Sequence, residues 1–213
     1  MKIINNYKYF TQENILQLKK LIGVTITAFD FDILSSNVLF NHDYNYFEIA
    51  WPNWLTLISH SGMKNIVNIK FGGEIELNEL KQECVNFKLK TSTKNYSKGG
   101  GISMNWFEIC KVDIFSNNSS EVIDNKFYGD LYNNQRINFV ESHNCNKLEY
   151  NEVSDEILLL TSNNKKKIML QVTESINGTI IMHFNEEHIV RILQNKYHTE
   201  SPLKNYNKRL TIE

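Results

Sequence analysis

Residues 156–193 read EILLLTSNNKKKIMLQVTESINGTIIMHFNEEHIVRIL, and this stretch decides the fold. Three apolar segments, at 157–160, 167–172 and 178–184, are separated by polar turns, which is typical of antiparallel strands joined in sequence order. Asn185 then stands as a helix N-cap, with two glutamates in the first turn and apolar residues at helical spacing. The pattern predicts a β-meander closed by an amphipathic helix.

The middle segment of the meander predicts which side chains face the core. Ile168, Leu170 and Val172 alternate with the other residues of the segment, so they share one face of the predicted strand. We expect this face to pack against Ile189 or Leu193 of the closing helix.

The N-terminal part of the chain contains a second helical pattern. Thr11 is a candidate N-cap, an apolar stripe follows to residue 22, and Gly23 suits the end of a helix. A strand is predicted next, at 24–33, in which the apolar side chains change face near Ala28. Such a change indicates a β-bulge or a strand buried on both faces.

The rest of the chain is dominated by strand patterns. Further strands are predicted at 46–51, 54–59, 66–71, 85–89, 104–115, 137–140 and 147–150. The polar residues 116–125 indicate a loop or a boundary between lobes. We therefore predict a β-rich α+β protein with a mainly antiparallel sheet, either as a single domain over 1–213 or as two similar lobes, 1–115 and 126–213.

Composition limits the classes of function. With 213 residues, 41% of them hydrophobic, the chain can bury a core without disulfide or metal cross-links. A net charge of −1 gives no general attraction to phosphate backbones, so nucleic-acid binding is not expected. Three widely spaced cysteines indicate reduced thiols, and no segment has the roughly 18 apolar residues of a membrane span. These features predict a cytoplasmic protein that does not insert into membranes.

Four dispersed residues are the candidates for catalysis. Asp30 and Asp32 lie two apart on a predicted strand, so their carboxylates share one face, as acid/base pairs sometimes do. The alternative is that they form the solvent side of an amphipathic strand. With His42 and His60 they could assemble an enzyme active site or a small-ligand site only through tertiary structure.

Metal and cofactor motifs are not predicted. His143 and Cys145 lie two apart, but zinc would require a second ligand pair at similar spacing. The glycine triplet 99–101 precedes a strand pattern, whereas a phosphate-binding loop opens into a helix. We therefore expect neither a metal nor a cofactor.

The densest aromatic cluster follows the polar stretch 41–43 and includes Tyr44, Tyr46 and Trp51. Such residues pack in cores or anchor protein interfaces, and the polar stretch favours an interface. Our leading hypothesis is a non-enzymatic cytoplasmic module that binds a protein partner, most concretely an immunity or antitoxin-like inhibitor. The alternatives are an enzyme or small-ligand protein using the four residues above, and a structural component that self-associates through sheet edges.

Overall fold

The computed structural model describes residues 1–31, 37–41, 46–50, 55–59, 68–77, 83–92, 100–124, 133–173, 179–194 and 205–213. Within these ranges the chain forms twelve strands and three helices, and β1 with β9 is the single parallel pairing. The protein is therefore a β-rich α+β protein with a mainly antiparallel sheet, as predicted. The elements are β1 Lys2–Lys8, α1 Gln12–Lys19, β2 Thr25–Phe31, β3 Asn37–Asn41, β4 Tyr46–Ala50, β5 Leu55–Ser59, β6 Asn68–Leu77, β7 Glu83–Ser92, β8 Gly100–Asp124, α2 Asn133–Ser142, β9 Lys147–Ser162, β10 Lys167–Thr173, β11 Thr179–His183, α3 Glu186–Leu193 and β12 Asn205–Ile212.

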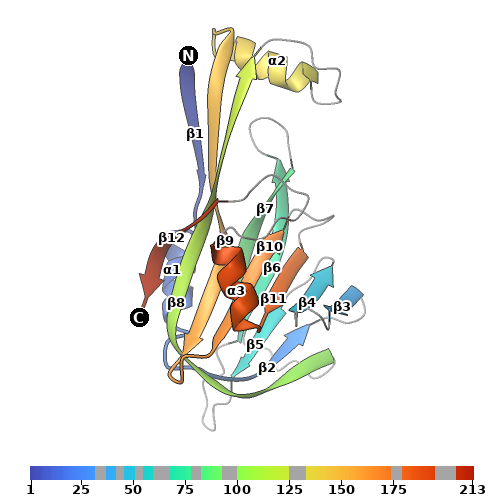
Figure 1. The fold of residues 1–213 in the computed structure, drawn as a ribbon, viewed down its shortest axis with the longest axis vertical. Coiled ribbons are helices and arrows are strands. Elements are labelled where there is room, and N and C mark those ends of the chain that lie inside the picture. The colour runs from blue at the N-terminus through green and yellow to red at the C-terminus, as the bar shows by residue number, and fades with distance from the viewer. Residues whose placement is uncertain are drawn as a thin grey trace.

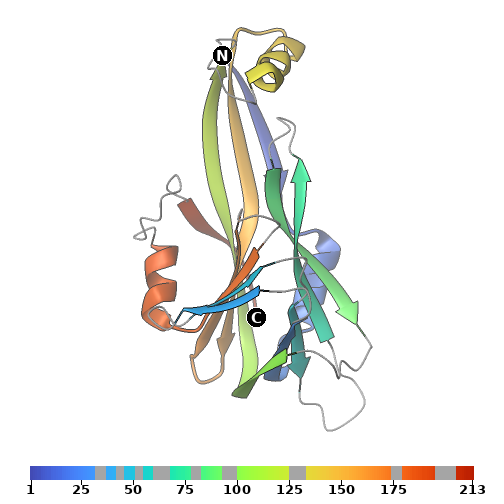
Figure 2. The ribbon, with the colours of Figure 1, turned by 90° about the vertical axis from the view of Figure 1, so that its right-hand side faces the viewer.

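The strands form two layers in the lower part of the molecule. Their order is β3-β4-β11-β10-β9-β8-β2-β5-β6-β7, with β1 also beside β9 and β12 also beside β8. The sheet turns back on itself after β8, so β6 and β7 face β9, β10 and β11 (Figure 2). The main core lies between the layers and includes Phe29, Leu57, Ile114 and Leu170. We call this two-layered part, with α1, α3 and β12, the body.

A second region, which we call the arm, projects from the body (Figure 1). It consists of β1, residues 117–124 of β8, residues 147–154 of β9, and α2. Helix α2 covers one face of these three strands through a small core. That core contains Ile123, Val140, Leu148 and Tyr150, with Ile4, Phe139 and Cys145 packed against it.

Local signals at the N-terminal helix are confirmed. Thr11 caps α1 by accepting from the Asn14 backbone N–H, and the Asn14 side chain accepts from the Thr11 N–H in return. Gly23 has a φ of 79°, a backbone conformation that favours glycine. The register of β2 shifts between Ile26 and Ala28 against both neighbouring strands, in agreement with the predicted bulge.

The meander and its closing helix are confirmed, but the packing face was predicted wrongly. Strands β9, β10 and β11 are neighbours in sequence order, and the Asn185 side chain caps α3. Leu170 is fully buried, yet it lies between the two layers of the body. Helix α3 packs instead on the opposite face, where Ile189 clusters with Met169 and Leu159. Strand β10 is buried on both faces, so alternation could not identify the side that the helix covers.

Two further predictions are wrong. Residues 137–140 belong to α2 rather than to a strand; the spacing of three between Ile137 and Val140 suits a helix, and a four-residue window cannot resolve the two periods. The loop predicted at 116–125 is strand β8 as far as Asp124. This segment is polar because one of its faces is not covered by the core. The division of the chain into two lobes stays a prediction.

Candidate functional site

The residues proposed for catalysis and binding lie largely outside the described part of the chain. The side chains of Asp30 and Tyr46 are not described, although their backbones lie in β2, opposite Thr56 of β5, and in β4, opposite His183 of β11. The remaining candidates, Asp32, His42, Tyr44, Trp51 and His60, lie outside the described residues altogether. Their roles stay predictions.

The described residues contain a different candidate, the uncovered face of the arm. Ile3 and Tyr7 of β1 and Val122 of β8 are 56%, 57% and 52% exposed. Glu149 of β9 is the register partner of both Ile3 and Val122, so these three residues form one row across the sheet. The next row towards the body contains Asn5 and Asn151, and Tyr7 lies in the row after that, opposite Val153. We call this surface the open face.

The open face continues a face that is buried in the body. Ile114 and Val122 lie an even number of positions apart on β8, so their side chains emerge on the same side of the strand. Around Ile114 this side packs against the second layer, and Ile114 is fully buried. The second layer does not follow β8 and β9 along the arm (Figure 2). Apolar side chains of the arm are exposed because the layer that would cover them ends.

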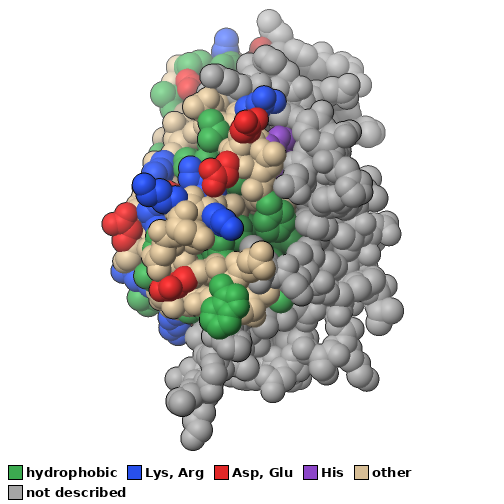
Figure 3. All heavy atoms as spheres, turned by 60° about the horizontal axis from the view of Figure 1, so that its bottom comes forward, with side chains coloured by type: hydrophobic (Ala, Val, Ile, Leu, Met, Phe, Trp, Pro, Cys, Tyr) green, Lys and Arg blue, Asp and Glu red, His purple; other side chains and the backbone are tan. Residues whose placement is uncertain are grey.

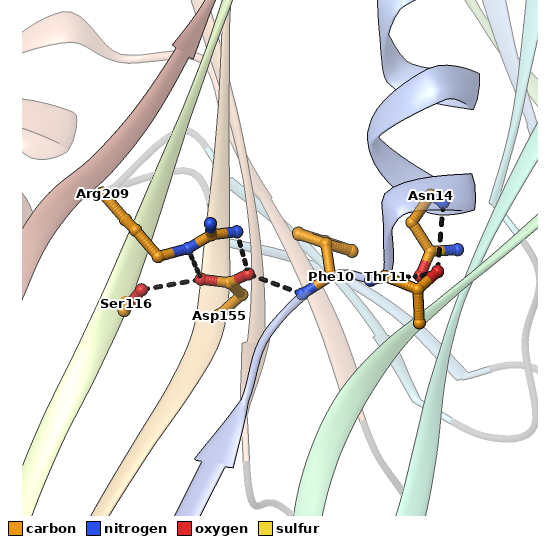
Figure 4. Close-up of polar contacts among 6 residues, drawn as sticks. All are labelled: Phe10, Thr11, Asn14, Ser116, Asp155 and Arg209. Atoms are coloured by element: carbon orange, nitrogen blue, oxygen red, sulfur yellow. Dashed lines mark hydrogen bonds and ion pairs between the residues drawn. The ribbon is translucent and has the colours of Figure 1, made fainter.

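A buried carboxylate marks the boundary between the covered and the open parts of this face (Figure 4). Asp155 is 3% exposed and receives hydrogen bonds from both Nε and Nη2 of Arg209. The Ser116 hydroxyl donates to it over 2.6 Å, and the Phe10 backbone N–H over 2.7 Å. Asp155 thus joins β9 to β12, β8 and the link between β1 and α1. Bidentate pairing of this kind is strong and directional.

The same arginine supports exposed aromatic side chains beside the open face. The rings of Tyr7 and Tyr9 are stacked with centroids 5.5 Å apart. The Arg209 guanidinium lies 4.7 Å from the centroid of the Tyr9 ring. Asp155 in turn fixes Arg209 through two hydrogen bonds, so the tyrosine pair rests on a side chain that is itself held in place.

A second buried polar network lies on the α3 side of the body. Phe115 pairs with Ile157 and Ser116 with Asp155, so Glu156 is the extra residue of a β-bulge. Its carboxylate accepts from Asn117 and Ser154 at 3.1 and 2.9 Å, and from the Tyr206 hydroxyl at 3.2 Å. Each of these groups is buried. Three donors thus converge on the buried Glu156 carboxylate, although Oδ1 of Asn117 has no hydrogen-bond partner among the described residues. Pairing of a buried carboxylate in this way is typical of a structural network.

The network extends to two histidines whose rings are in contact and tilted to each other. The Gln171 amide donates to Tyr206, and its oxygen lies 3.1 Å from Nε2 of His183. The His183 and His188 rings have centroids 5.0 Å apart. Burial, with the nearby His188, lowers the pKa of His183 to about 3, and burial together with Arg191 lowers the pKa of His188. Both rings are therefore neutral near pH 7.

Asp113 is the third buried acidic group of the body. Burial acts to raise its pKa, but hydrogen bonds from Thr211 and Lys111 and the charges of Lys111 and Lys208 outweigh burial and lower it. Lys111 and Lys208 each approach its carboxylate to 3.3 Å. This cluster pairs its charges internally, which again indicates a structural role.

Other kinds of site find little support among the described residues. They contain no group of three or more histidine, cysteine, aspartate or glutamate side chains that could hold a metal ion. An open hollow of about 510 Å³ lies against α3, lined by Glu186, Glu187, Val190 and Arg191. Acidic and basic side chains are interspersed over the described surface at the lower end of the molecule (Figure 3). None of the described helices has the length and apolar character needed to cross a membrane.

Comparisons with protein-family models, with curated proteins and with solved structures give no match. The candidate site therefore stands on its geometry. The open face was not among the predicted site residues, although the apolar positions Ile3 and Tyr7 lie an even number of residues apart and suit a strand. That pattern cannot reveal which face of the strand is covered.

Proposed function

We propose that this chain is a non-enzymatic protein-binding module and that the open face of the arm is its contact surface. The observation that carries the proposal is the group of half-exposed apolar side chains, Ile3, Tyr7 and Val122, on the sheet face opposite α2. Exposed apolar groups gathered on a single face are typical of interaction sites. Tyr9, held by Arg209, adds an aromatic anchor, and tyrosine is enriched among residues that dominate binding energies.

The narrower form of the proposal is an inhibitor of the immunity or antitoxin type, acting in the cytoplasm. The support for it is the shape of the molecule, because a projecting sheet presents a contact surface away from the body (Figure 1). An inhibitor of this kind would act by covering a functional surface of its target and would need no catalytic group of its own. Genes adjacent to the one that encodes this chain offer a first check, since such inhibitors act on a specific target.

Two matched valines provide the decisive experiment. Val122 lies on the open face and Val190 on α3, and they are 52% and 39% exposed. Proteins from the native host are captured with the full chain, identified, and titrated against wild type, Val122→Ser and Tyr7→Ser, with Val190→Ser as the control. We expect the two arm variants to weaken binding about tenfold or more, as for anchors worth over 1 kcal/mol, and the control to bind as wild type does.

The contrary result is equally clear. If Val190→Ser weakens capture and the arm variants do not, the contact surface lies at the hollow beside α3. If circular dichroism shows all four proteins folded and no specific partner is captured, the binding function itself is wrong.

A further inference from the structure

We infer that the arm binds an extended segment of a different protein, which adds as a further strand along the free edge of β1. This inference rests on the proposed function and specifies its mode and the chemistry of its partner. Three observations carry it: the unpaired edge, the absence of protective features along that edge, and the distribution of charge on β1.

Strand β1 lies at the edge of the arm. It pairs with β9 over seven consecutive residues, Lys2 to Lys8, without a register shift. No other strand in the described ranges pairs with β1. Within the described ranges, alternate backbone N–H and C=O groups along its outer edge therefore have no strand partner and can receive a new strand, which is how sheets recruit extended peptides.

The edge lacks the features that usually prevent such pairing. Proteins protect edge strands with prolines, bulges or charged side chains near the middle of the strand. Between Ile3 and Tyr7, β1 has none of these, and its only charged side chains are the terminal Lys2 and Lys8. Lys8 lies 3.6 Å from Glu152 within the arm. Five consecutive uncharged residues can thus pair with an incoming strand.

Charge on β1 argues against a second copy of this chain as the occupant. Full antiparallel pairing of two β1 strands would place Lys2 opposite Lys8 of the copy, and full parallel pairing would place Lys2 beside Lys2. Like charges at paired positions are destabilising. An acidic residue opposite Lys2 would instead be favourable, and β1 contains none, so a segment of a different chain fits this edge better than β1 of a second copy.

The size of the open face also favours strand addition over simple stacking of faces. Seven residues span about 24 Å, and three strands span about 14 Å, so the face measures about 340 Å². A stable interface requires about 800 Å² from each partner. A strand on the edge of β1 would add backbone hydrogen bonds and widen the sheet, so that the open face could contact more of the partner.

The side chains of β1 define the segment that would fit. Ile3 and Tyr7 are four residues apart on the open face, so the residues paired with them should be β-branched or aromatic. Ile4 packs against the α2 core on the other face. The expected ligand is an extended segment with apolar residues four apart on one face and an acidic residue at the end that pairs with Lys2.

The test uses a displayed library of random nonapeptides selected against the full chain, with affinities of chosen synthetic peptides measured by fluorescence anisotropy. We expect selected peptides to match the pattern above and to lose about tenfold or more in affinity for Tyr7→Ser. Each peptide is then made with backbone N-methyl groups at its odd positions or at its even positions. One set should abolish measurable binding while the other, the matched control, binds within about threefold of the parent, because only alternate N–H groups point towards β1.

Other outcomes separate the inference from the proposed function. Peptides that lose affinity for Tyr7→Ser but tolerate both methylation sets would overturn strand addition and leave the open face as a binding surface. A library that yields no binder, or only binders indifferent to Tyr7→Ser, would count against both. A concentration-dependent dimer without peptide, with slowed hydrogen exchange of β1 amides, would show that a second copy takes the edge and would overturn the inference.

Discussion

The body and the arm share two strands, β8 and β9, but cover the faces of these strands differently. In the body both faces of these strands are covered, one by the second layer and the other by α3, so Ile114 and Ile157 are fully buried. In the arm α2 covers one face and the other is open. A strand pair can thus extend beyond its core, so that a packing face becomes an exposed one.

Polar residues make this change possible. The boundary between the two regions is occupied by Asp155, Ser116 and Arg209, which close the top of the apolar core with charge-assisted hydrogen bonds. Beyond them, the open face alternates apolar residues with polar ones, such as Asn5 and Asn151, which are hydrogen-bonded to each other at 3.0 Å. The arm can therefore remain in water while still exposing apolar groups.

Asp155→Ala should have the largest effect, because the boundary depends on this carboxylate. The substitution leaves Arg209, Ser116 and the Phe10 N–H without their acceptor, and breaking a buried ion pair costs about 3–5 kcal/mol. Urea unfolding measures the loss. Glu149→Ala, on the same strand within the open face, should change stability by less than about 0.5 kcal/mol. Equal effects would mean that Asp155 does not join the two regions.

Leu170→Ala and Met169→Ala should each cost about 2–5 kcal/mol, since both side chains are fully buried. The two residues differ in their neighbours, because only Met169 clusters with Ile189 of α3. Double-mutant cycles with Ile189→Ala should give a coupling of about 0.5–3 kcal/mol for Met169 and below about 0.5 kcal/mol for Leu170. The reverse order would restore the face predicted from the sequence.

The histidines of the body should make its stability depend on pH. Because the pKa of His183 falls from 6.5 to about 3 on folding, the unfolded chain binds the proton more readily, and stability decreases as the pH drops below about 6.5. At pH 5 the loss from this group is about 2 kcal/mol. His183→Gln should reduce the difference in unfolding free energy between pH 7 and pH 5. An unchanged difference would show that this ring is accessible to protons in the folded protein.

The cap of α3 should contribute less. Asn185→Ala removes the acceptor for the His188 backbone N–H and should cost about 1 kcal/mol. Asn185→Asp keeps a capping oxygen and is the matched control, expected to retain wild-type stability within a few tenths of a kcal/mol. Chemical denaturation of the two variants checks the pair, and a neutral alanine variant would indicate that packing alone holds the helix.

Substitutions on the open face should have the smallest effect on stability. Tyr7→Ser and Val122→Ser change half-exposed side chains, so the free energy of unfolding should change by about 0.5 kcal/mol or less. This is the opposite of their expected effect on binding. Thermal unfolding measures it, and a loss above about 2 kcal/mol would show that another part of the chain covers this face.

Prediction from the sequence succeeded where the signal was local. Thr11 and Asn185 form their caps with backbone groups three residues away, and the change of apolar face near Ala28 reports a bulge within one strand. It failed at 137–140 and at 116–124, where a polar or short apolar pattern suits more than one structure. The structure of these two segments depends on tertiary packing, because Val140 of α2 covers Ile123 of β8 and Leu148 of β9.

By itself the sequence determined the fold class, the meander and both N-capped helices, because hydrogen bonds and side-chain alternation over a few residues decide these features. Tertiary structure alone decided which face of β10 lies under α3, and that β8 and β9 continue past the second layer. Ile3, Tyr7 and Val122 are exposed because the arm extends beyond the second layer. Whether an apolar residue is core or contact surface depends on where the opposing layer ends, and no local pattern records that.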